Sequence, residues 1–299
     1  MEILVTGANG FIGRNLTSYL REKGHTVIRT DLRSGDLAGD IADEEFVLKT
    51  LASQTFDSIV HLAAIADVKA CINDPYSCYK VNMFGTLNML ELASKKRAHR
   101  FIYGSSANVY GVPTELPVKE TTPFAPRTPY DHSKAMSENL IQSYGRNKGL
   151  QFVILRSWKL FGEHDLPTTA VSRFIKACLK GEQIQLYNAG RDTTDPYHIE
   201  NYCQAVELCL EREEAIGEAF NIGTGKEVSI RQLAELIKRL TNSDSRLIDL
   251  PPRTSEEAQP MISYPSIDKI SSTLSYRPVV SLEEGLRRTI KHQKDIFMT

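Results

Sequence analysis

The chain has 299 residues, of which 41% are hydrophobic and 24% are charged, and its formal net charge is -1 at pH 7. This length and composition suit one large globular domain, or two modest ones, with a substantial core. A nearly neutral chain creates no field that would gather nucleic acid or an anionic membrane, so we expect neither as a partner. Any anionic ligand must therefore be held by local groups in a pocket.

The cysteines and the lack of long apolar runs indicate a compartment. The five cysteines are Cys71, Cys78, Cys178, Cys203 and Cys209. Their odd number, without C-x-x-C or Cys/His metal spacing, fits core or surface thiols in a reduced compartment and predicts no metal site. No apolar run approaches the roughly 18 residues of a membrane span, and the first strand begins at Glu2, which leaves no room for a signal peptide. We expect a soluble, cytoplasmic protein.

The N-terminal stretch predicts a dinucleotide-binding turn. An apolar run at residues 3–5 leads into T-G-x-x-G-x-x-G and then into a helical pattern that begins with Phe11 and Ile12. Gly7 permits the tight turn, Gly10 lets the backbone approach a pyrophosphate, and Gly13 lets the helix pack close to the strand. The N–H groups and positive end of that helix would then face the phosphates.

The second strand predicts which dinucleotide binds. Residues 25–30 read as a strand that ends at Asp31, about 20 residues after the glycines, where a carboxylate can accept both ribose hydroxyls and repel a ribose phosphate. NAD is therefore favoured over NADP. Arg33 is the opposing signal, because a cation there could hold a 2′-phosphate.

Strand and helix patterns alternate through the first half of the chain. Buried strands are predicted at residues 57–64, 100–106 and 151–156, with helices at residues 43–51 and 75–98 and another opening at Tyr130. This alternation predicts an α/β fold with a doubly wound parallel sheet of the Rossmann type. Ligands bind beyond the carboxyl ends of such strands, so the hydroxyls of Ser105 and Ser106 belong to the same rim as the glycine turn. Asn82 lies on a largely apolar helix, and we interpret it as a buried hydrogen-bonding strut.

The regular alternation of predicted strands and helices ends after residue 160. Helices are predicted at residues 170–179, 199–211 and 230–240 and from Leu282 onward, with strands near residues 184–186 and 219–222. We assign residues 1–160 to the NAD-binding domain. Residues 161–299 form, in this prediction, a smaller mixed α/β substrate lobe that closes a cleft and is interleaved with the first domain.

The sequence Tyr130-Asp131-His132-Ser133-Lys134 places a phenol and an ammonium on one helix face, because residues four apart lie one above the other. A phenol with a pKa of about 10 is a poor base, but a neighbouring ammonium and a cationic nicotinamide both favour phenolate. A surface Tyr–Lys pair is common. Its place after a strand that ends in two serines favours catalysis instead.

Together these motifs resemble the extended short-chain dehydrogenase/reductase superfamily, in its NAD-dependent epimerase/dehydratase branch that acts on nucleotide sugars. The resemblance runs nearly end to end. The matching stretches are Thr6 to Gly13, Asp31, Asp40-Ile41, His61-Leu62-Ala63-Ala64, Asn82, Gly85-Thr86, Ser105-Ser106-Ala107-x-Val109-Tyr110-Gly111, Tyr130-x-x-x-Lys134, Tyr276-x-Pro278 and residues 281–285.

The resemblance implies roles for these residues. Tyr130 would be the acid/base for a sugar hydroxyl, Lys134 would hold the nicotinamide ribose and lower the tyrosine pKa, and Ser106 would hydrogen-bond the same oxygen. Implied NAD-binding positions are Gly7, Gly10, Phe11, Ile12, Gly13, Asp31, Asp40, Ile41, Leu62, Ala63, Ala64, Asn82, Ser105, Tyr130, Lys134 and Ser157. Implied substrate-binding positions are Ser106, Asn108, Tyr130, Lys159 and Arg253.

Departures from the family pattern favour one reaction. Family dehydratases carry an acidic pair directly after the Ser/Thr, and one type of decarboxylase uses a Glu at the second of these places. Here the two places hold Ala107 and Asn108, which exchange no protons, so both reactions are disfavoured. The motif looks most like hexose 4-epimerases that work through a transient 4-keto sugar. A 4-keto nucleotide-sugar reductase using NAD(P)H stays open, as does a non-enzymatic dinucleotide sensor, although sensors usually lack the Tyr/Lys pair.

Other departures concern substrate and assembly. Lys159 stands where many nucleotide-sugar enzymes have Asn, and Thr194 stands where they have the first of two diphosphate-clamping arginines, the second matching Arg253. Lys159 would contact a diphosphate oxygen or an acidic sugar, or else its stem would cover Trp158. Because the helices at residues 75–98 and 130–148 often pair with their copies in this superfamily, we expect a homodimer, although their apolar residues also suit a monomer's core.

Overall fold

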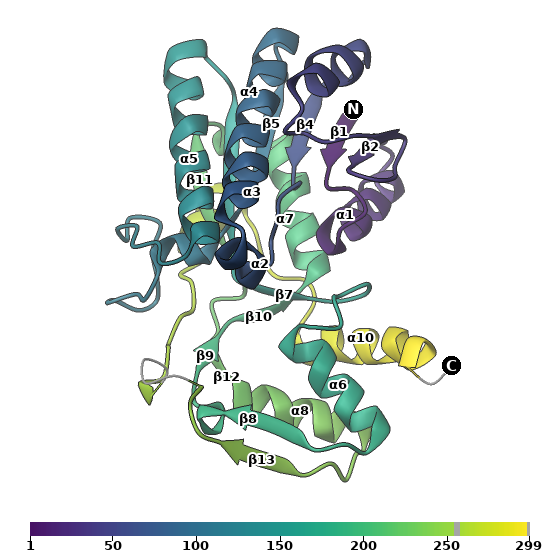
Figure 1. Ribbon diagram of the computed structural model, residues 1–299, viewed down its shortest axis with the longest axis vertical. Coiled ribbons are helices and arrows are strands. Elements are labelled where there is room, and N and C mark those ends of the chain that lie inside the picture. The colour runs from purple at the N-terminus through teal and green to yellow at the C-terminus, as the bar shows by residue number, and fades with distance from the viewer. Residues whose placement is uncertain (254–257, 298–299) are drawn as a thin grey trace.

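The structure is a computed structural model that describes residues 1–253 and 258–297. Figure 1 shows a large sheet covered by helices in the upper part and a smaller lobe below it. None of the helices within the described ranges is long and apolar enough to cross a membrane.

The large sheet has seven strands in the order β11-β6-β5-β4-β1-β2-β3, and each neighbouring pair is parallel. Its strands are β1 (Glu2–Thr6), β2 (Thr26–Asp31), β3 (Leu37–Ala38), β4 (Ser58–His61), β5 (Arg100–Ser106), β6 (Phe152–Ser157) and β11 (Glu218–Ile222). From β1 the chain proceeds outward to β2 and β3, then returns to β4 on the other side. The strand order therefore reverses between β1 and β4, which is where ligands bind in open α/β sheets. The predicted doubly wound Rossmann-type sheet is confirmed.

Apolar side chains alternate between the two faces of this sheet. Ile3 and Val5 pack on one face with residues of α1 (Phe11–Glu22) and α7 (Ile199–Glu211). Leu4 points to the other face and packs with residues of α4 (Gly85–Lys96) and α5 (Pro129–Lys148). The sheet is thus buried on both sides, and only its edges and strand ends can reach solvent.

The long helix predicted at residues 75–98 is interrupted. It consists of α3 (Pro75–Tyr79), a wide π-helical turn at Lys80–Phe84 and α4, and it is preceded by α2 (Val68–Asn73). The helix predicted at residues 43–51 is likewise a π-helical turn at Phe46–Thr50 followed by a 3-10 turn at Leu51–Ser53. A further 3-10 turn, Ala107–Tyr110, follows β5.

The start of α5 is firmly specified. Thr128 accepts a hydrogen bond from the backbone N–H of Asp131, the Asp131 carboxylate accepts one from the Thr128 N–H, and Pro129 occupies the first helical position. This capping box and the proline fix where the helix begins. Tyr130 is therefore held in the first turn of α5.

The smaller lobe has its own core. Its elements are β7 (Lys159–Phe161), α6 (Ala170–Lys180), β8 (Ile184–Tyr187), a 3-10 turn at Asn188–Gly190, β9 (Thr193–Thr194), β10 (Pro196–His198), β12 (Val228–Ser229), α8 (Ile230–Thr241), β13 (Leu247–Leu250) and α10 (Leu282–Phe297). Apolar residues of α6, α8, α10 and β8 form one cluster that is separate from the clusters on the sheet.

One sequence assignment is wrong. Residues 219–222 and 199–211 were predicted in the smaller lobe, but β11 pairs in parallel with β6 at the edge of the large sheet and α7 packs beside α1. A 3-10 turn at Glu213–Ala215 joins them, and α9 (Asp268–Leu274) also packs on the sheet. The chain therefore crosses between the two parts repeatedly, while the boundary at residue 160 stays a prediction.

Candidate active site

The glycine turn after β1 closes against the loop after β4. Gly7 has a φ of +67°, and a Cβ there would lie 2.8 Å from the backbone nitrogen of Ala63. A Cβ on Gly13 would lie 2.2 Å from the carbonyl oxygen of Gly7. Only glycine fits both places without moving backbone. Helix α1 follows Gly10 without a side-chain cap, so its first-turn N–H groups are open to an anionic ligand.

Asp31 is fixed beside this turn. One carboxylate oxygen accepts a hydrogen bond from the N–H of Asn9 at 2.9 Å, and the other accepts from the N–H of Leu32 at 2.8 Å. Each carboxylate oxygen can accept a second hydrogen bond, so both can still receive ribose hydroxyls. The predicted adenine contacts are held similarly, since Asp40 accepts from the N–H of Ala42 and the carbonyl of Ile41 accepts from an Asn88 side chain.

A buried chain of side chains supports the loop after β4. Thr86 donates to the carbonyl of Asn82, so its oxygen accepts from Nε2 of His61 at 3.0 Å. The other ring nitrogen, Nδ1, then accepts from the Thr6 hydroxyl at 2.7 Å. Burial lowers the pKa of His61 to about 3, so the imidazole is neutral, as this arrangement requires.

The Thr6 oxygen completes this chain by accepting hydrogen bonds from the N–H groups of Leu62 and Ala63. The loop after β4, which is predicted to contact the cofactor, is thereby tied to β1 and α4. The sequence contained these residues within its motifs but did not predict the chain of hydrogen bonds. The available signal was the presence of a threonine, Thr6, and a histidine, His61, on two strands that the sequence predicts to be buried.

Asn82 is the buried strut that its position on an apolar helix indicates. Its amide oxygen accepts from the N–H of Ile65 at 2.7 Å, and its amide nitrogen donates to the carbonyl of Ile65 and to the Ser133 hydroxyl. It therefore links the segment after β4 to α5. Whether it also touches the cofactor stays a prediction.

The structure brings Ser106, Tyr130 and Lys134 together at the carboxyl edge of the sheet. Ser106 ends β5, and Tyr130 and Lys134 lie one helical turn apart on α5. The Lys134 ammonium donates to the carbonyl of Gly104 at 2.8 Å and lies 4.7 Å from the centre of the Tyr103 ring. Both Tyr130 and Lys134 are largely buried.

The protein alone does not make Tyr130 acidic. Burial raises the pKa of Tyr130 to about 12, and the hydrogen bond with Ser106 offsets only part of that rise. Burial also lowers the pKa of Lys134 to about 8. In the chain by itself the Lys134 ammonium faces Gly104 and lies 6.0 Å from the centre of the Tyr130 ring. The lowering of the tyrosine pKa by Lys134 therefore stays a prediction for the NAD-loaded protein, in which a cationic nicotinamide would act in the same direction.

A buried ion pair fixes helix α5 to the sheet. Glu138 on α5 is fully buried and accepts hydrogen bonds from Nε and Nη2 of Arg156 on β6. The same carboxylate accepts from the hydroxyl of Ser105. The hydroxyl hydrogen of Ser105 is therefore already used, so Ser105 can contact a cofactor only through its hydroxyl oxygen or its backbone. The sequence did not predict this pair, although Glu138 lies four residues after Lys134 on the same helix face.

The Asn108 side chain donates a hydrogen bond to a carboxylate that also accepts hydrogen bonds from the backbone. Its side-chain nitrogen donates to Oδ1 of Asp131 at 3.0 Å, while Oδ2 accepts from the N–H groups of Arg127 and Thr128. Asp131 therefore serves to cap α5. Ser157, another predicted cofactor contact, shares a hydrogen bond with the Tyr197 hydroxyl at 2.6 Å.

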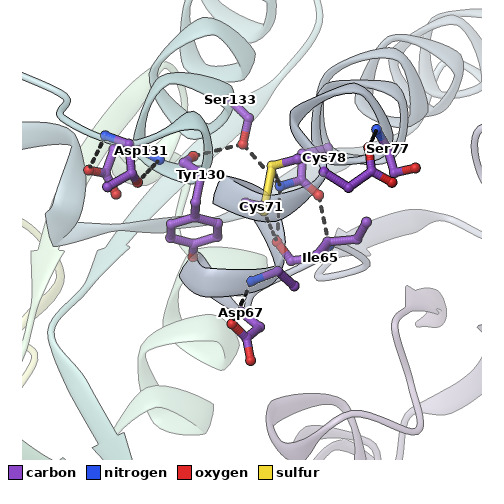
Figure 2. The surroundings of a disulfide bond; sticks show 12 residues. Ile65, Asp67, Cys71, Ser77, Cys78, Tyr130, Asp131 and Ser133 are labelled. Atoms are coloured by element: carbon purple, nitrogen blue, oxygen red, sulfur yellow. Dashed lines mark hydrogen bonds between the residues drawn. A yellow bond between two sulfur atoms is a disulfide. The ribbon is translucent and has the colours of Figure 1, made fainter.

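A disulfide lies directly against Tyr130, the predicted acid/base. Cys71 on α2 and Cys78 on α3 are joined, and both cluster with the ring of Tyr130 (Figure 2). The prediction that all five cysteines are thiols is wrong for these two, because the chain reverses at Asp74, the cap of α3, and brings their Cα atoms to 5.1 Å. The other three, Cys178, Cys203 and Cys209, are buried free thiols.

The predicted substrate cations lie in different places. Lys159 begins β7, which pairs with β10, and its N–H donates to the carbonyl of Asp195. Arg253 lies over the ring of Tyr187 at the end of β8, with 5.0 Å between the guanidinium carbon and the ring centre. The part of the chain that the structure describes holds no group of three His, Cys, Asp or Glu side chains that could bind a metal ion.

Comparison with known proteins identifies the family. The model of the NAD dependent epimerase/dehydratase family matches residues 3–223. The chain belongs to this family. Its similarity to solved structures includes the UDP-glucose 4-epimerase of Thermotoga maritima with UDP-glucose, with a TM-score of 0.91, 31% identity and 99% of each chain covered.

Two further similar proteins are named for different reactions. The UDP-glucuronic acid decarboxylase 1 of Xenopus tropicalis is 33% identical, covering 97% of this chain and 71% of that protein. A variant UDP-glucuronic acid 4-epimerase of Bacillus cereus, solved with NAD and UDP-4-deoxy-4-fluoro-glucuronic acid, has a TM-score of 0.89, 27% identity and 99% and 100% coverage. Family membership therefore covers several reactions.

The cofactor is NAD, and the residues present fit it. The open N-terminus of α1 can take the pyrophosphate, and the carboxylate of Asp31 faces the glycine turn where the adenine ribose would lie. The crevice lies where the strand order reverses, between β1 and β4. This chain is thus an epimerase/dehydratase family member whose glycine turn and Asp31 fit a dinucleotide.

Proposed function

We propose that this protein is a nucleotide-sugar 4-epimerase that uses NAD and a transient 4-keto sugar, with a UDP-hexose-like substrate. The observation that carries the proposal is the assembly of Ser106, Tyr130 and Lys134 at the rim of the cofactor crevice, without an acid at the two positions after Ser106. The first feature supports oxidation of a sugar hydroxyl. The second leaves the resulting ketone with no route to elimination.

Each residue of the triad has a separate task. Tyr130 takes the proton of the sugar C4 hydroxyl and returns it, and Ser106 hydrogen-bonds the same oxygen and holds it against the phenol. Lys134 binds the nicotinamide ribose through its ammonium. Bound NAD would supply the hydride acceptor and donor for C4, so no net oxidation would occur. Epimerisation requires the ketose to present its opposite face before the hydride returns.

Elimination and decarboxylation lack a proton carrier in this chain. Ala107 and Asn108 cannot exchange a proton, and the nearest carboxylate to Asn108, that of Asp131, already accepts three hydrogen bonds. An acid catalyst must be free to give and take protons at the substrate. The proposal therefore places this chain with the epimerases of its family.

We propose a homodimer for the assembly. The outer faces of α3, the turn after it and α5 expose Tyr76, Phe84 and Met136, whose exposed fractions are 79%, 53% and 44%. Exposed apolar side chains of this size on adjacent helices are typical of a protein interface. Sedimentation at micromolar concentration that gives only the 33.6 kDa species would overturn this proposal.

A panel of UDP-, dTDP-, GDP- and CDP-sugars tests the function. We expect product NMR to show exchange of configuration at C4 for at least one neutral or acidic hexose, with no accumulation of reduced cofactor at 340 nm. A dehydrated or decarboxylated product would contradict the proposal. Net consumption of added NADH or NADPH would identify a 4-keto reductase instead, and binding without any turnover would identify a dinucleotide sensor.

A further inference from the structure

The strand register places Lys159 close to the reacting centre. Ser106, at the end of β5, pairs with Ser157, at the end of β6. Lys159 follows Ser157 by two residues and begins β7. Lys159 therefore leaves the sheet beside the catalytic serine, at the edge where ligands bind in this architecture.

The environment of the Lys159 ammonium is unusual. The residue is solvent-accessible, yet enough protein surrounds it that desolvation lowers its pKa, with the charge of Asp131 acting in the opposite direction. Within residues 1–253 and 258–297, no hydrogen bond or ion pair engages this ammonium. A partly desolvated cation without a contact partner is stabilised when an anion binds.

Trp158, the residue before this lysine, is held in place by other side chains. Trp158 belongs to the core on the sheet, its ring centre lies 6.0 Å from that of Tyr110, and its indole nitrogen donates to Ser263. The tryptophan is thus held by its own partners. The Lys159 head is left free for a ligand.

Two cations mark the two ends of the substrate path. Arg253 lies over Tyr187 at the end of β8, in the smaller lobe, whereas Lys159 lies on β7, between the lobe and the sheet (Figure 1). Lys159 follows Ser157, the strand partner of Ser106, by two residues. This register places Lys159 nearer to Ser106 and Tyr130, at the sugar end of the proposed site, and leaves Arg253 for the nucleotide end.

We propose that Lys159 binds a carboxylate on the sugar, so that the preferred substrate is a nucleoside diphosphate uronic acid and not a neutral hexose. The inference rests on the proposed function, because it takes the cleft beside Tyr130 to hold a nucleotide sugar. A carboxylate on the ligand supplies the direct ion-pair partner that the described residues do not, since Asp131 acts on the ammonium only from a distance. It also meets the ammonium where a neutral hydroxymethyl group would leave the cation unpaired.

Binding to the NAD-loaded protein tests this directly. Lys159→Met keeps the aliphatic stem and removes the charge, Lys159→Arg restores a cation, and Lys95→Met, on the exposed end of α4, is the matched control. The ligands are UDP-glucuronate, UDP-glucose and UDP alone, measured by calorimetry. We expect Lys159→Met to weaken UDP-glucuronate about tenfold or more, with UDP-glucose and UDP within about twofold of wild type. Lys159→Arg should recover part of the loss, and Lys95→Met should change nothing.

Two outcomes would overturn the inference. An equal loss for all three ligands would mean that Lys159 binds the diphosphate, and an unchanged affinity for UDP-glucuronate would mean that it binds no anion. Because the readout is binding, it is independent of the reaction. A charge-dependent preference for the uronate without C4 epimerisation would keep this inference and reject the proposed function.

Discussion

Removing the Glu138 carboxylate should strongly destabilise the protein, because the structure leaves its partner no alternative. Glu138 is fully buried, and the side chain of Arg156 is 5% exposed. In Glu138→Ala the guanidinium loses its ion pair and the Ser105 hydroxyl loses its acceptor. Breaking a buried pair by removing one partner costs about 3–5 kcal/mol. Domains have a total stability of about 5–15 kcal/mol, so little margin would remain.

The same pair sets the size of the coupling. In the double variant Glu138→Met with Arg156→Met, neither charge is left buried alone. Its loss in the free energy of unfolding should therefore be smaller, by at least about 2 kcal/mol, than the sum of the losses in the single variants Glu138→Met and Arg156→Met. The double variant should still be less stable than the wild type. Arg156 also donates to the Tyr110 hydroxyl and to the carbonyl of Glu120, and these groups lose a partner.

Urea unfolding followed by circular dichroism measures these free energies. Lys148→Ala is the control on the same helix, because it breaks an ion pair with Glu91 whose members are 43% and 34% exposed. An exposed pair of this kind contributes about 0–1 kcal/mol. If Glu138→Ala costs no more than Lys148→Ala, the buried pair does not hold α5 to the sheet and the reasoning fails.

Three further predictions concern the cofactor, the disulfide and Lys134. Titration should show NAD binding more tightly than NADP, and Asp31→Ala should narrow that gap, whereas a wild-type preference for NADP would reverse the assignment. Reduction of Cys71–Cys78, seven residues apart, should lower the free energy of unfolding by about 2.5 kcal/mol on chain-entropy grounds, and a melting temperature unmoved by dithiothreitol would contradict this. Burial lowers the pKa of Lys134 from 10.5 to about 8, so the unfolded chain binds the extra proton between these values. The contribution of Lys134 to the stability of the cofactor-free protein should therefore rise across that pH window by about 3 kcal/mol. Urea unfolding should show the wild type gaining about that much stability relative to Lys134→Met between pH 7.5 and 10.5, and a constant difference between the two proteins would contradict this.

The parallel sheet and its cofactor edge could be predicted because local signals agreed with one another. Apolar runs bounded by Gly7 and by the serines after residue 104 predicted strands at their observed places. The glycine spacing then specified a tight turn and a helix directly after β1. A fold can be predicted from its sequence where the local patterns agree with the global fold in this way.

Strand β11 could not be placed from its own residues. A short apolar run such as residues 219–222 predicts a buried strand but carries no information about its neighbour. Its partner, β6, lies more than sixty residues earlier in the chain, beyond an intervening lobe. The register emerges only when both faces of the large sheet are covered, which is a property of the assembled core.

Within the site, positions were predictable and energies were not. The spacing of Tyr130 and Lys134 placed both on one face of α5, yet the direction of the ammonium depends on the carbonyl of Gly104, which no spacing reveals. The Cys71–Cys78 bond likewise depends on the break between α2 and α3. Burial and partner geometry decide pKa values and covalent pairing, and both require three dimensions.

The fate of the C4 hydrogen tests the central claim most directly. UDP-glucose and UDP-glucuronate labelled with deuterium at C4 should be incubated with the NAD-loaded protein, and the products examined by NMR and mass spectrometry. We predict that the C4 epimer of at least one of them forms with its deuterium retained at C4, and that Tyr130→Phe slows the conversion by about two orders of magnitude or more while leaving NAD affinity unchanged. Loss of the deuterium to the bulk cofactor pool, or normal turnover in Tyr130→Phe, would contradict the account.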